Sequence, residues 1–364
     1  MEHLRHFRIY SKQEILSATR IRRFETKLGE AIKCIQHEAA KAPEESLQQA
    51  LDASSATYIV FGIAEDIGVR ANYGKGGTDT LWQTFMTSFL NLQSNDFMSG
   101  ENVLLLGHFD FSDLRILIEQ NAHDEDEKVL AYRHAVLTVD DEVEYLTKMI
   151  TSAGKIPVAI GGGHNNAYPL IKGSAKGLNK SGKLPLAQIN AMNLDAHSDY
   201  RTTEGRHSGN GFRYAEEDGY LQKYCIIGLQ EGLIPQNVWV DIVNNPFIDF
   251  VSFEDIFIHE KRTFMQAVAH ACAFTDDAFT GIELDLDAIQ NTLSSAETPT
   301  GIQTVHARQY INYAAADSKV AYLHICEGAA ILADGRKQET IGKLVAHLVC
   351  DFIKSRDSIN AGQQ

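Results

Sequence analysis

Short runs of apolar and β-branched residues alternate with amphipathic stretches along most of the chain. Such runs, bounded by Gly or polar residues, predict strands at 57–62, 103–107, 156–160, 187–194, 224–229, 247–251, 280–286 and 321–325. Helical patterns separate several of these runs, at 80–92, 140–153, 264–274 and 339–354. Strands that alternate with helices predict a mainly parallel sheet covered on both faces.

The pattern predicts one catalytic domain rather than two. Residues 1–50 are polar with interleaved charges, and we expect a helical segment packed on the domain. No Pro/Ser/Gly-rich linker divides the stretch 51–356, which we interpret as a single α/β domain followed by a C-terminal tail at 357–364. In sheets of this kind, ligands bind in loops past the carboxyl ends of the strands.

The composition argues against a nucleic-acid-binding protein, a disulfide-rich protein and a membrane protein. A formal net charge of -15 argues against a nucleic-acid binder, which usually carries a basic face. The five cysteines are odd in number and form no Cys-x-x-Cys pair, so we expect no disulfide framework and a cytoplasmic location. No apolar run approaches the roughly 20 residues of a membrane span, and no secretory signal is visible, so no membrane partner is expected.

Three of the expected strand ends carry polar clusters. The clusters are Gly161-Gly-Gly-His164, Asp195-Ala-His197-Ser-Asp199 and Glu283-Leu-Asp285-Leu-Asp287. If the strand continues through the second cluster, alternation puts Asp195, His197 and Asp199 on one face. Carboxylates at the mouth of a buried sheet repel one another unless cations or protons neutralise them.

The six candidate ligands favour a site for two metal ions. Imidazoles mixed with carboxylates suit Mn²⁺, Fe²⁺ or Zn²⁺ better than Mg²⁺ or Ca²⁺. Six ligands are too many for one open catalytic ion and suit two ions that share bridging carboxylates. A single Asp-x-Asp is often a cap and a single Gly-rich turn is often only a turn, but all three clusters together favour the metal site.

The ordered motifs Gly-Gly-x-His, Asp-Ala-His-x-Asp and Asp-x-Asp resemble those of the ureohydrolase superfamily of arginases, agmatinases and formimidoylglutamases. The resemblance runs from about residue 62 to 353. It implies an arginase-like three-layer α/β/α sandwich, two Mn²⁺ ions bridged by a water molecule, and a homo-oligomer. By position, one ion would be bound by His164, Asp195, Asp199 and Asp285, and the other by Asp195, His197, Asp285 and Asp287.

Two positions favour the formimidoylglutamase branch within this superfamily. Gly163 precedes the metal-binding histidine, where arginases and agmatinases usually have Asp. Arg201 stands where that branch often has Arg and arginase has Asn. The resemblance therefore implies hydrolysis of N-formimidoyl-L-glutamate to L-glutamate and formamide, a reaction of histidine metabolism.

The segment Ser208-Gly-Asn210-Gly-Phe212 is ambiguous between the branches. It is similar to the Ser-Gly-x-Pro-Phe of formimidoylglutamases, but it lacks the Pro and shares Ser-Gly-Asn with arginases. The arginase histidine that shuttles protons has no counterpart, since Phe212 occupies its place. His207 lies nearby in the sequence and is a candidate substitute.

The resemblance also suggests residues for the substrate. Glu327 matches the glutamate that binds the guanidinium or formimidoyl nitrogen, although Gly328-Ala329 replaces the usual Asn-Pro. Glu283 also departs from the family, because a small residue is common there. Asp287 is a candidate proton relay as well as a ligand. The remaining candidate substrate contacts are Arg201 and Arg206, for carboxylates, and Ser208 and Asn210.

Other functions stay open at this stage. An arginase- or agmatinase-like enzyme would release urea from a guanidino substrate. A metal-binding regulatory protein with impaired catalysis is consistent with Gly328-Ala329 and the missing shuttle histidine. A Mg²⁺-dependent phosphotransferase is disfavoured by the histidines and by the lack of a Gly-x-x-x-x-Gly-Lys-Ser/Thr loop.

Overall fold

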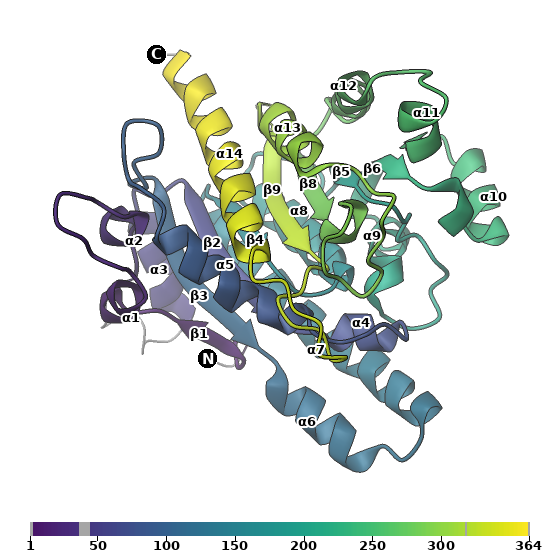
Figure 1. Ribbon diagram of the computed structural model, residues 1–364, viewed down its shortest axis with the longest axis horizontal. Helices are drawn as coiled ribbons and strands as arrows, with labels where there is room; N and C mark the ends of the chain where they lie inside the picture. The colour runs from purple at the N-terminus through teal and green to yellow at the C-terminus, as the bar shows by residue number, and fades with distance from the viewer. Residues whose placement is uncertain (1–2, 36–43, 317–318, 363–364) are drawn as a thin grey trace.

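A computed structural model describes residues 3–35, 44–316 and 319–362. Its centre is a nine-stranded sheet in the order β1-β3-β2-β4-β9-β8-β5-β6-β7 (Figure 1). Strand β1 pairs with β3 in the antiparallel sense, and all the other neighbours are parallel. The predicted α/β fold with a mainly parallel sheet is confirmed.

Apart from β1, which was not predicted, the strands lie close to their predicted positions. They are β1 Phe7–Ile9, β2 Tyr58–Ala64, β3 Val103–Asp110, β4 Ile156–Ile160, β5 Ile189–Leu194, β6 Leu221–Leu229, β7 Ile248–Ser252, β8 Thr280–Asp285 and β9 Val320–Cys326. The central strands β5, β8 and β9 are buried along their whole length. Burial on both faces explains why β5 and β9 consist mostly of apolar residues, whereas β8 also carries the buried Glu283 and Asp285.

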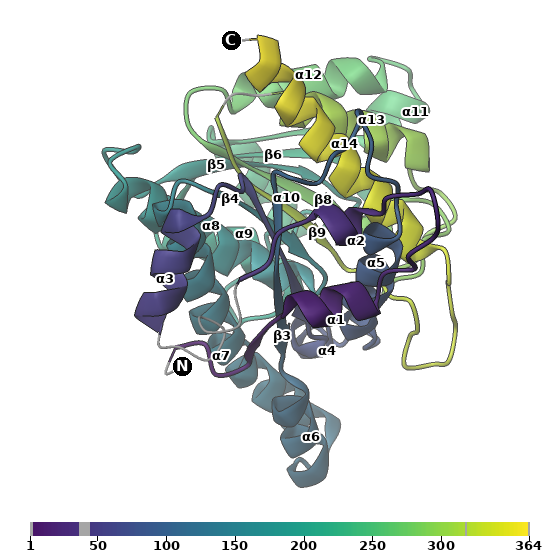
Figure 2. The ribbon, with the colours of Figure 1, turned by 90° about the vertical axis from the view of Figure 1, so that its left-hand side faces the viewer.

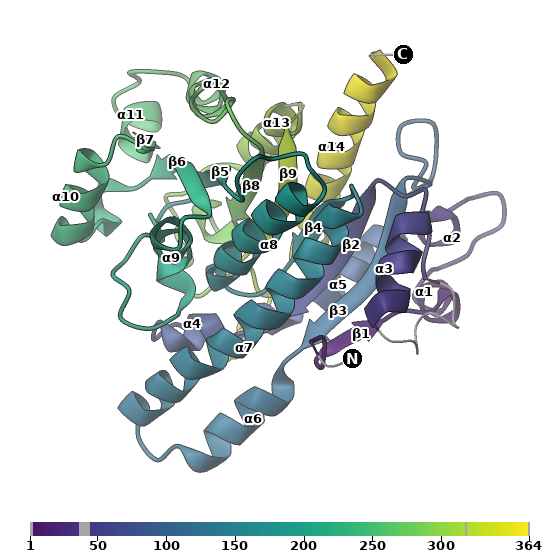
Figure 3. The same cartoon turned by 180° about the vertical axis from the view of Figure 1, so that it is seen from behind.

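Helices cover both faces of the sheet. They are α1 Lys12–Ser17, α2 Leu28–Ala31, α3 Glu44–Ala53, α4 Ile67–Ala71, α5 Leu81–Leu90, α6 Ser112–Asn121, α7 Glu125–Ser152, α8 Ala167–Lys180, α9 Gly211–Glu217, α10 Gln236–Asn244, α11 Phe253–Phe257, α12 Phe264–Phe274, α13 Thr304–Ala315 and α14 Ile341–Gly362. Helices α5, α13 and α14 lie in front of the sheet in Figure 1, and α3, α7 and α8 cover the opposite face, which is turned toward the viewer in Figure 3. Figure 2 shows the sheet between these two layers.

Each face of the sheet has its own apolar core. One core joins β-strand residues such as Ile282 and Leu323 to Phe85 of α5 and Phe352 of α14. The other joins the opposite strand face to the helices of the α7 and α8 layer. Gly62 of β2 allows the indole of Trp82 to approach, because a Cβ there would lie 2.2 Å from the ring.

Three local expectations differ from the structure. The segment 1–50 was expected to be helical, but β1 adds an antiparallel edge strand to the sheet, and residues 36–43 lie outside the described part. Helix α7 begins at Glu125, capped by Asp124, so Asp140 lies in its middle and not in its first turn. Helix α14 continues to Gly362 without a break at 357.

Among the described residues, no helix is both long enough and apolar enough to cross a membrane.

Candidate metal centre

The three polar clusters meet at the carboxyl ends of four adjacent strands. His164 follows β4 in a short 3-10 turn, and the segment 195–199 follows β5. Asp285 ends β8, and Asp287 lies in the 3-10 turn that follows it. Since β4, β9, β8 and β5 are neighbours in the sheet, residues more than 100 positions apart in sequence converge there.

The first group of candidate ligands surrounds the ring of His164. Its Nδ1 lies 2.8 Å from Oδ2 of Asp199, 3.2 Å from Oδ2 of Asp285 and 3.3 Å from Oδ2 of Asp195. His164 and Asp195 have no exposed surface, and Asp285 is 1% exposed. Three carboxylates around one imidazole nitrogen form a set of ligand atoms that a single cation can reach.

The second group shares a member with the first. His197 Nδ1 lies 3.2 Å from Oδ2 of Asp287 and 3.6 Å from Oδ1 of Asp195. Asp195 therefore offers Oδ2 to the first group and Oδ1 to the second. This arrangement brings the six predicted ligands into two adjoining groups with Asp195 between them.

The alternation expected for residues 195–199 is wrong. Strand β5 ends at Leu194, and the ligands converge through a bent loop instead of an extended strand. Asp195 Oδ1 accepts a hydrogen bond from the backbone N–H of His197 at 2.7 Å, which closes a turn. Asp199 then adopts a left-handed backbone with φ 44°, a strained conformation that such sites often contain. The side chains of Asp195, His197 and Asp199 thus converge because the backbone turns, and not because an extended strand places them on one face.

The charges of the site perturb its titratable groups. Burial opposes the charged form of His164, yet the surrounding carboxylates raise its pKa well above the usual value. The charge of Asp287 raises the pKa of His197 in the same direction. Burial, followed by the charge of Asp195, raises the pKa of Asp199 to about 6. Among the protein side chains alone, the site therefore retains protons that bound cations would displace.

The donor set fits divalent ions. Asp287 Oδ1 is buried and has no hydrogen-bond partner among the described residues, so an acceptor oxygen is left for another ligand. The mixture of carboxylate oxygens and imidazole nitrogens suits Mn²⁺, Fe²⁺ or Zn²⁺. A third possible group of His164, His324 and Cys326 is fully buried behind the first.

A cavity of about 380 Å³ opens beside both groups. His197, Asp199, Asp285 and Asp287 line one part of it, and Glu327 contributes as well. The volume is in the range of small-molecule sites. A small substrate can therefore reach both candidate groups.

Glu327 is held at the cavity by an unusual backbone. Its φ is 62°, and its N–H donates to the carbonyl of Gly162 at 3.0 Å. Its Oε1 accepts a hydrogen bond from the backbone N–H of His164 at 2.8 Å. Burial, together with the nearby charge of Asp287, raises the pKa of Glu327 to about 8. These contacts link Glu327 to the loop that carries the first ligand.

Besides Glu327, two more of the predicted substrate contacts line the cavity, together with a residue that the sequence did not suggest. Arg201 and Ser208 both line it. Asn72, which follows α4, accepts a hydrogen bond from Arg201 Nη1 at 3.0 Å and donates to Ser208 Oγ at 3.4 Å. The loop at 72–77 showed only a turn composition, so no motif marked Asn72 as functional.

Arg206 and Asn210 lie elsewhere. The Arg206 guanidinium is buried and pairs with Asp140 of α7 at 2.8 Å, and it also donates to Asn210 Oδ1 at 2.9 Å and to the carbonyl of Asn165. Asn210 in turn donates to the carbonyls of Thr202 and Gly205. Neither residue lines the cavity. Arg206 connects this loop to α7 through Asp140, and Asn210 forms hydrogen bonds within the loop.

His207 does not stand in for the missing shuttle histidine. It is fully buried and does not line the cavity. Its Nδ1 accepts a hydrogen bond from the N–H of Gly209 at 3.1 Å. Burial, with the charges of Arg133 and Arg201 nearby, lowers its pKa to about 3. The structure therefore places this imidazole outside the cavity lining.

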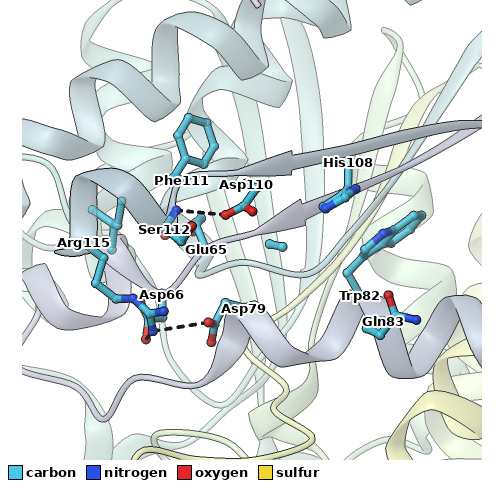
Figure 4. A pocket seen from close by; sticks show the side chains of 12 residues that line it. Glu65, Asp66, Asp79, Trp82, Gln83, His108, Asp110, Phe111, Ser112 and Arg115 are labelled. Carbon is cyan, nitrogen blue, oxygen red and sulfur yellow. Dashed lines mark hydrogen bonds and ion pairs between the residues drawn. The ribbon is translucent and has the colours of Figure 1, made fainter. Parts of the chain in front are cut away.

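A second cavity of about 280 Å³ lies at the ends of β2 and β3 (Figure 4). It contains Asp66, Asp79 and Asp110, but the first two are paired with arginines. Arg115 Nη1 lies 3.3 Å from Asp79 and 3.5 Å from Asp66, and Arg70 lies 2.9 Å from Asp66. We call this set the arginine-paired cavity.

A model of the arginase family matches residues 90–353 of this chain. A formimidoylglutamase of Aromatoleum aromaticum is 23% identical over 312 residues, covering 84% of this chain and 86% of the relative. A formimidoylglutamase of Macrococcus caseolyticus is 26% identical over 304 residues, covering 82% and 85%.

Solved structures share the fold. The formimidoylglutamase of Bacillus subtilis superimposes with a TM-score of 0.69 at 15% identity, covering 93% of this chain and 94% of that one. The Trypanosoma cruzi formiminoglutamase with Mn²⁺ has a TM-score of 0.66 at 17% identity, covering 91% and 98%. The agmatine ureohydrolase of Thermoplasma volcanium has a TM-score of 0.63 at 19% identity, covering 86% and 94%.

Proposed function

Because this chain belongs to the arginase family, we propose that it is a binuclear manganese hydrolase that converts N-formimidoyl-L-glutamate to L-glutamate and formamide. The curated relatives described above are formimidoylglutamases, and the Trypanosoma cruzi formiminoglutamase structure contains Mn²⁺. Both relatives are matched over more than four fifths of their length. The likeness to these relatives therefore extends over most of their length and is not confined to the metal-binding motifs.

One observation carries the proposal. The groups around His164 and His197 share Asp195 and adjoin a cavity that also contains Glu327 and Arg201. Hydrolysis of this substrate requires two cation sites. It also requires a carboxylate that binds the amidine group, as Glu327 can, and a guanidinium that binds a substrate carboxylate, as Arg201 can. A metal-binding regulatory protein would have no need for the last two.

We assign one ion to His164, Asp195, Asp199 and Asp285, and the other to His197, Asp195, Asp285 and Asp287. When bound, two divalent ions lower the pKa of a water molecule toward neutrality and act as Lewis acids on the C–N group. The role of the protein ligands is to hold these positions. Asp195, with one oxygen toward each group, has the geometry of a bridging ligand.

Glu327 orients the formimidoyl group. One of its oxygens is used by the N–H of His164, and the other is left for an N–H of the substrate. The formimidoyl group is planar and cationic, so a carboxylate gives a charge-assisted hydrogen bond. Its pKa of about 8 belongs to the side chains alone, and a cationic substrate would favour the ionised form.

Arg201, Ser208 and Asn72 form the part of the cavity suited to the glutamate end. The Arg201 side chain is exposed and reaches Asn72, so the guanidinium can turn toward a substrate carboxylate. Asn72 and Ser208 offer an amide and a hydroxyl close to it. Arg206 receives no substrate contact in this proposal, because its hydrogen bonds are already formed inside the protein.

The reaction adds one water molecule across the C–N bond. The formimidoyl carbon gains the oxygen and becomes formamide, and the nitrogen of glutamate leaves with the added proton. Asp287 Oδ1 is the buried oxygen without a hydrogen bond, and we assign to it the relay of that proton to the leaving nitrogen. Asp287 would also help to hold an ion, and its Oδ2 lies 3.2 Å from His197 Nδ1.

The direct test is a substrate screen on the purified full chain loaded with Mn²⁺. N-formimidoyl-L-glutamate, arginine and agmatine are supplied separately, and formamide and urea are both measured. We expect formamide from N-formimidoyl-L-glutamate with kcat/KM of at least ~10⁴ M⁻¹s⁻¹, the lower end of the usual enzyme range.

Other outcomes would replace the proposal. Release of urea from arginine or agmatine as the faster reaction would make the chain an amidinohydrolase of the same family. No turnover of any of the three, with two ions bound, would support the impaired regulatory protein.

A cytoplasmic location and assembly into a homo-oligomer stay predictions. The helical hairpin of α6 and α7 projects from the body of the molecule (Figures 1 and 3). Its exposed apolar side chains include Ile116, Leu117, Leu130 and Leu137. Such side chains often mark contact surfaces between proteins. Light scattering coupled to size-exclusion chromatography would measure the number of subunits.

A further inference from the structure

A row of buried polar side chains crosses the sheet directly beneath the metal ligands. Asn193 of β5, Glu283 of β8 and His324 of β9 are register partners, and none of them has exposed surface. All three are unusual inside a parallel sheet, where apolar residues predominate. Burying polar and charged groups costs free energy unless each is paired, so we expect these three side chains to have a structural or functional role.

Glu283 lies two residues before Asp285 on the same strand, and thus on the same face. Its Oε2 lies 2.6 Å from Nδ1 of His324 and 3.4 Å from Nε2 of His164. Its Oε1 accepts a hydrogen bond from the hydroxyl of Tyr322 at 2.6 Å. The carboxylate therefore contacts the one nitrogen of His164 that does not face the other carboxylates.

We propose that Glu283 is a positioning residue of the metal centre: its carboxylate, 3.4 Å from Nε2 of His164, holds the ring so that Nδ1 faces the carboxylates of the first group. This Nε2 is buried and has no hydrogen bond among the described residues, so the ion pair with Glu283 is the contact that orients it. The inference rests on the proposed function, since it assigns a role within the same metal centre. A metal-binding histidine usually donates its second N–H to a carboxylate or carbonyl, which fixes its tautomer and orientation.

Neighbouring contacts agree with this role. Asn193 Nδ2 donates to Asp195 Oδ2 at 2.9 Å, so the same row supports a second ligand of the same ion. In the other group, the His197 side chain is 30% exposed, and its ion pairs within the described part of the chain are with the candidate ligands Asp195 and Asp287. Within the described residues, the buried polar row thus contacts ligands of the first group, through Glu283 to His164 and Asn193 to Asp195. The departure of Glu283 from the small residue common in the family acquires a physical explanation.

The test compares Glu283→Gln with Tyr322→Phe. Glu283→Gln removes the charge that faces His164 and His324, whereas Tyr322→Phe removes only the hydroxyl contact of the same carboxylate and leaves the partner of His164 in place. Mn²⁺ binding is titrated without substrate, by calorimetry and by electron paramagnetic resonance, on the full chain. We expect E283Q to weaken one of the two ions about 10- to 100-fold, the other much less, and Y322F to change either by under about threefold.

Three outcomes decide the matter. Wild-type affinity for both ions in a folded E283Q protein overturns the inference. An equal loss in Y322F also overturns it, because packing of the network would then explain both. No binding of Mn²⁺ by the wild-type chain would instead sink the proposed function itself.

If E283Q does not fold, the role of Glu283 can be tested on the wild-type protein instead. A crystal structure of the Mn²⁺-loaded chain should show His164 Nε2 within about 3.2 Å of a Glu283 oxygen, inside hydrogen-bond range. A water molecule or another acceptor in that place would overturn the assignment.

Discussion

Two acidic cavities lie at the same edge of the sheet, and their carboxylates are neutralised in different ways. In the arginine-paired cavity at β2 and β3, Asp66 and Asp79 face the permanent charges of Arg70 and Arg115. In the metal centre at β4, β9, β8 and β5, the cationic partners of the carboxylates among the described residues are imidazoles, and Asp287 Oδ1 lacks a hydrogen bond.

The difference shows why acidic residues alone do not identify a metal site. A guanidinium stays protonated under all ordinary conditions and satisfies its partners permanently. An imidazole can give up its proton and become a ligand. The choice of partner therefore separates a carboxylate cluster that holds the fold together from one that is able to bind cations.

The largest expected effect is the loss of both ions in Asp195→Ala, because Asp195 belongs to both ligand groups. Metal-ion catalysis supplies several kcal/mol, so activity should fall by about 10³-fold or more. Metal content by mass spectrometry and the formamide assay measure the two effects. The matched control is Asp79→Ala in the arginine-paired cavity, which should keep two ions. Two tightly bound ions in folded D195A would end its role as the shared ligand.

The converse effect is expected for Asp66→Asn. Asp66 is 2% exposed and pairs with Arg70 and Arg115, so the variant weakens charge-assisted hydrogen bonds of a buried group. We expect the free energy of unfolding to fall by about 2 kcal/mol, with Mn²⁺ stoichiometry unchanged. Chemical denaturation and metal analysis measure both. A loss of bound Mn²⁺ would show that the two cavities are not independent.

A smaller effect on substrate binding is expected for Arg201→Ala. A charge-assisted hydrogen bond contributes about 1.5–3 kcal/mol, so kcat/KM should fall about 10- to 100-fold, mainly through KM. Arg213→Ala is the matched control, because Arg213 pairs with Glu217 and Asp241 away from the cavity. Equal kinetics for both variants would remove Arg201 from the substrate site.

The smallest effect is a pH dependence of stabilisation by Mn²⁺. The pKa is raised to about 6 for Asp199 and to about 8 for Glu327, above the values of about 4 expected in the unfolded chain. The folded chain thus holds extra protons in this window, and the stability that they contribute is lost as the pH rises through the folded pKa values. A bound ion would replace the proton of Asp199 and, by its charge, favour the ionised form of Glu327, so the rise in Tm on adding Mn²⁺ should grow from pH 6 to pH 8.

Melting curves with and without Mn²⁺ at pH 6, 7 and 8 measure this trend. A rise in Tm that stays constant or shrinks with pH would contradict the proton displacement expected at the metal centre.

The sequence predicted the sheet and the ligands better than the backbone between them. Buried strands such as β5 and β9 are mostly apolar, and the dense polar clusters at the strand ends stand out against them. The turn that brings Asp199 to a φ of 44° depends on local hydrogen bonds that alternation does not encode. Strand β1 was missed because three residues at a sheet edge carry almost no periodic signal.

Substrate contacts were harder to predict than ligands. Arg201 and Arg206 look alike in sequence, yet one lines the cavity and the other pairs with Asp140 in the middle of a helix. That pairing depends on α7 beginning at Glu125, well before the predicted start. The role of Glu283 likewise follows from its register partner on β9 and not from its own motif.

The most direct test is anomalous diffraction from crystals of the full chain grown with Mn²⁺. We predict two manganese peaks, one among His164, Asp195, Asp199 and Asp285, and one among Asp195, His197, Asp285 and Asp287. The arginine-paired cavity should show none. A single peak, or peaks only beside Asp66 and Asp79, would contradict the account of a binuclear centre.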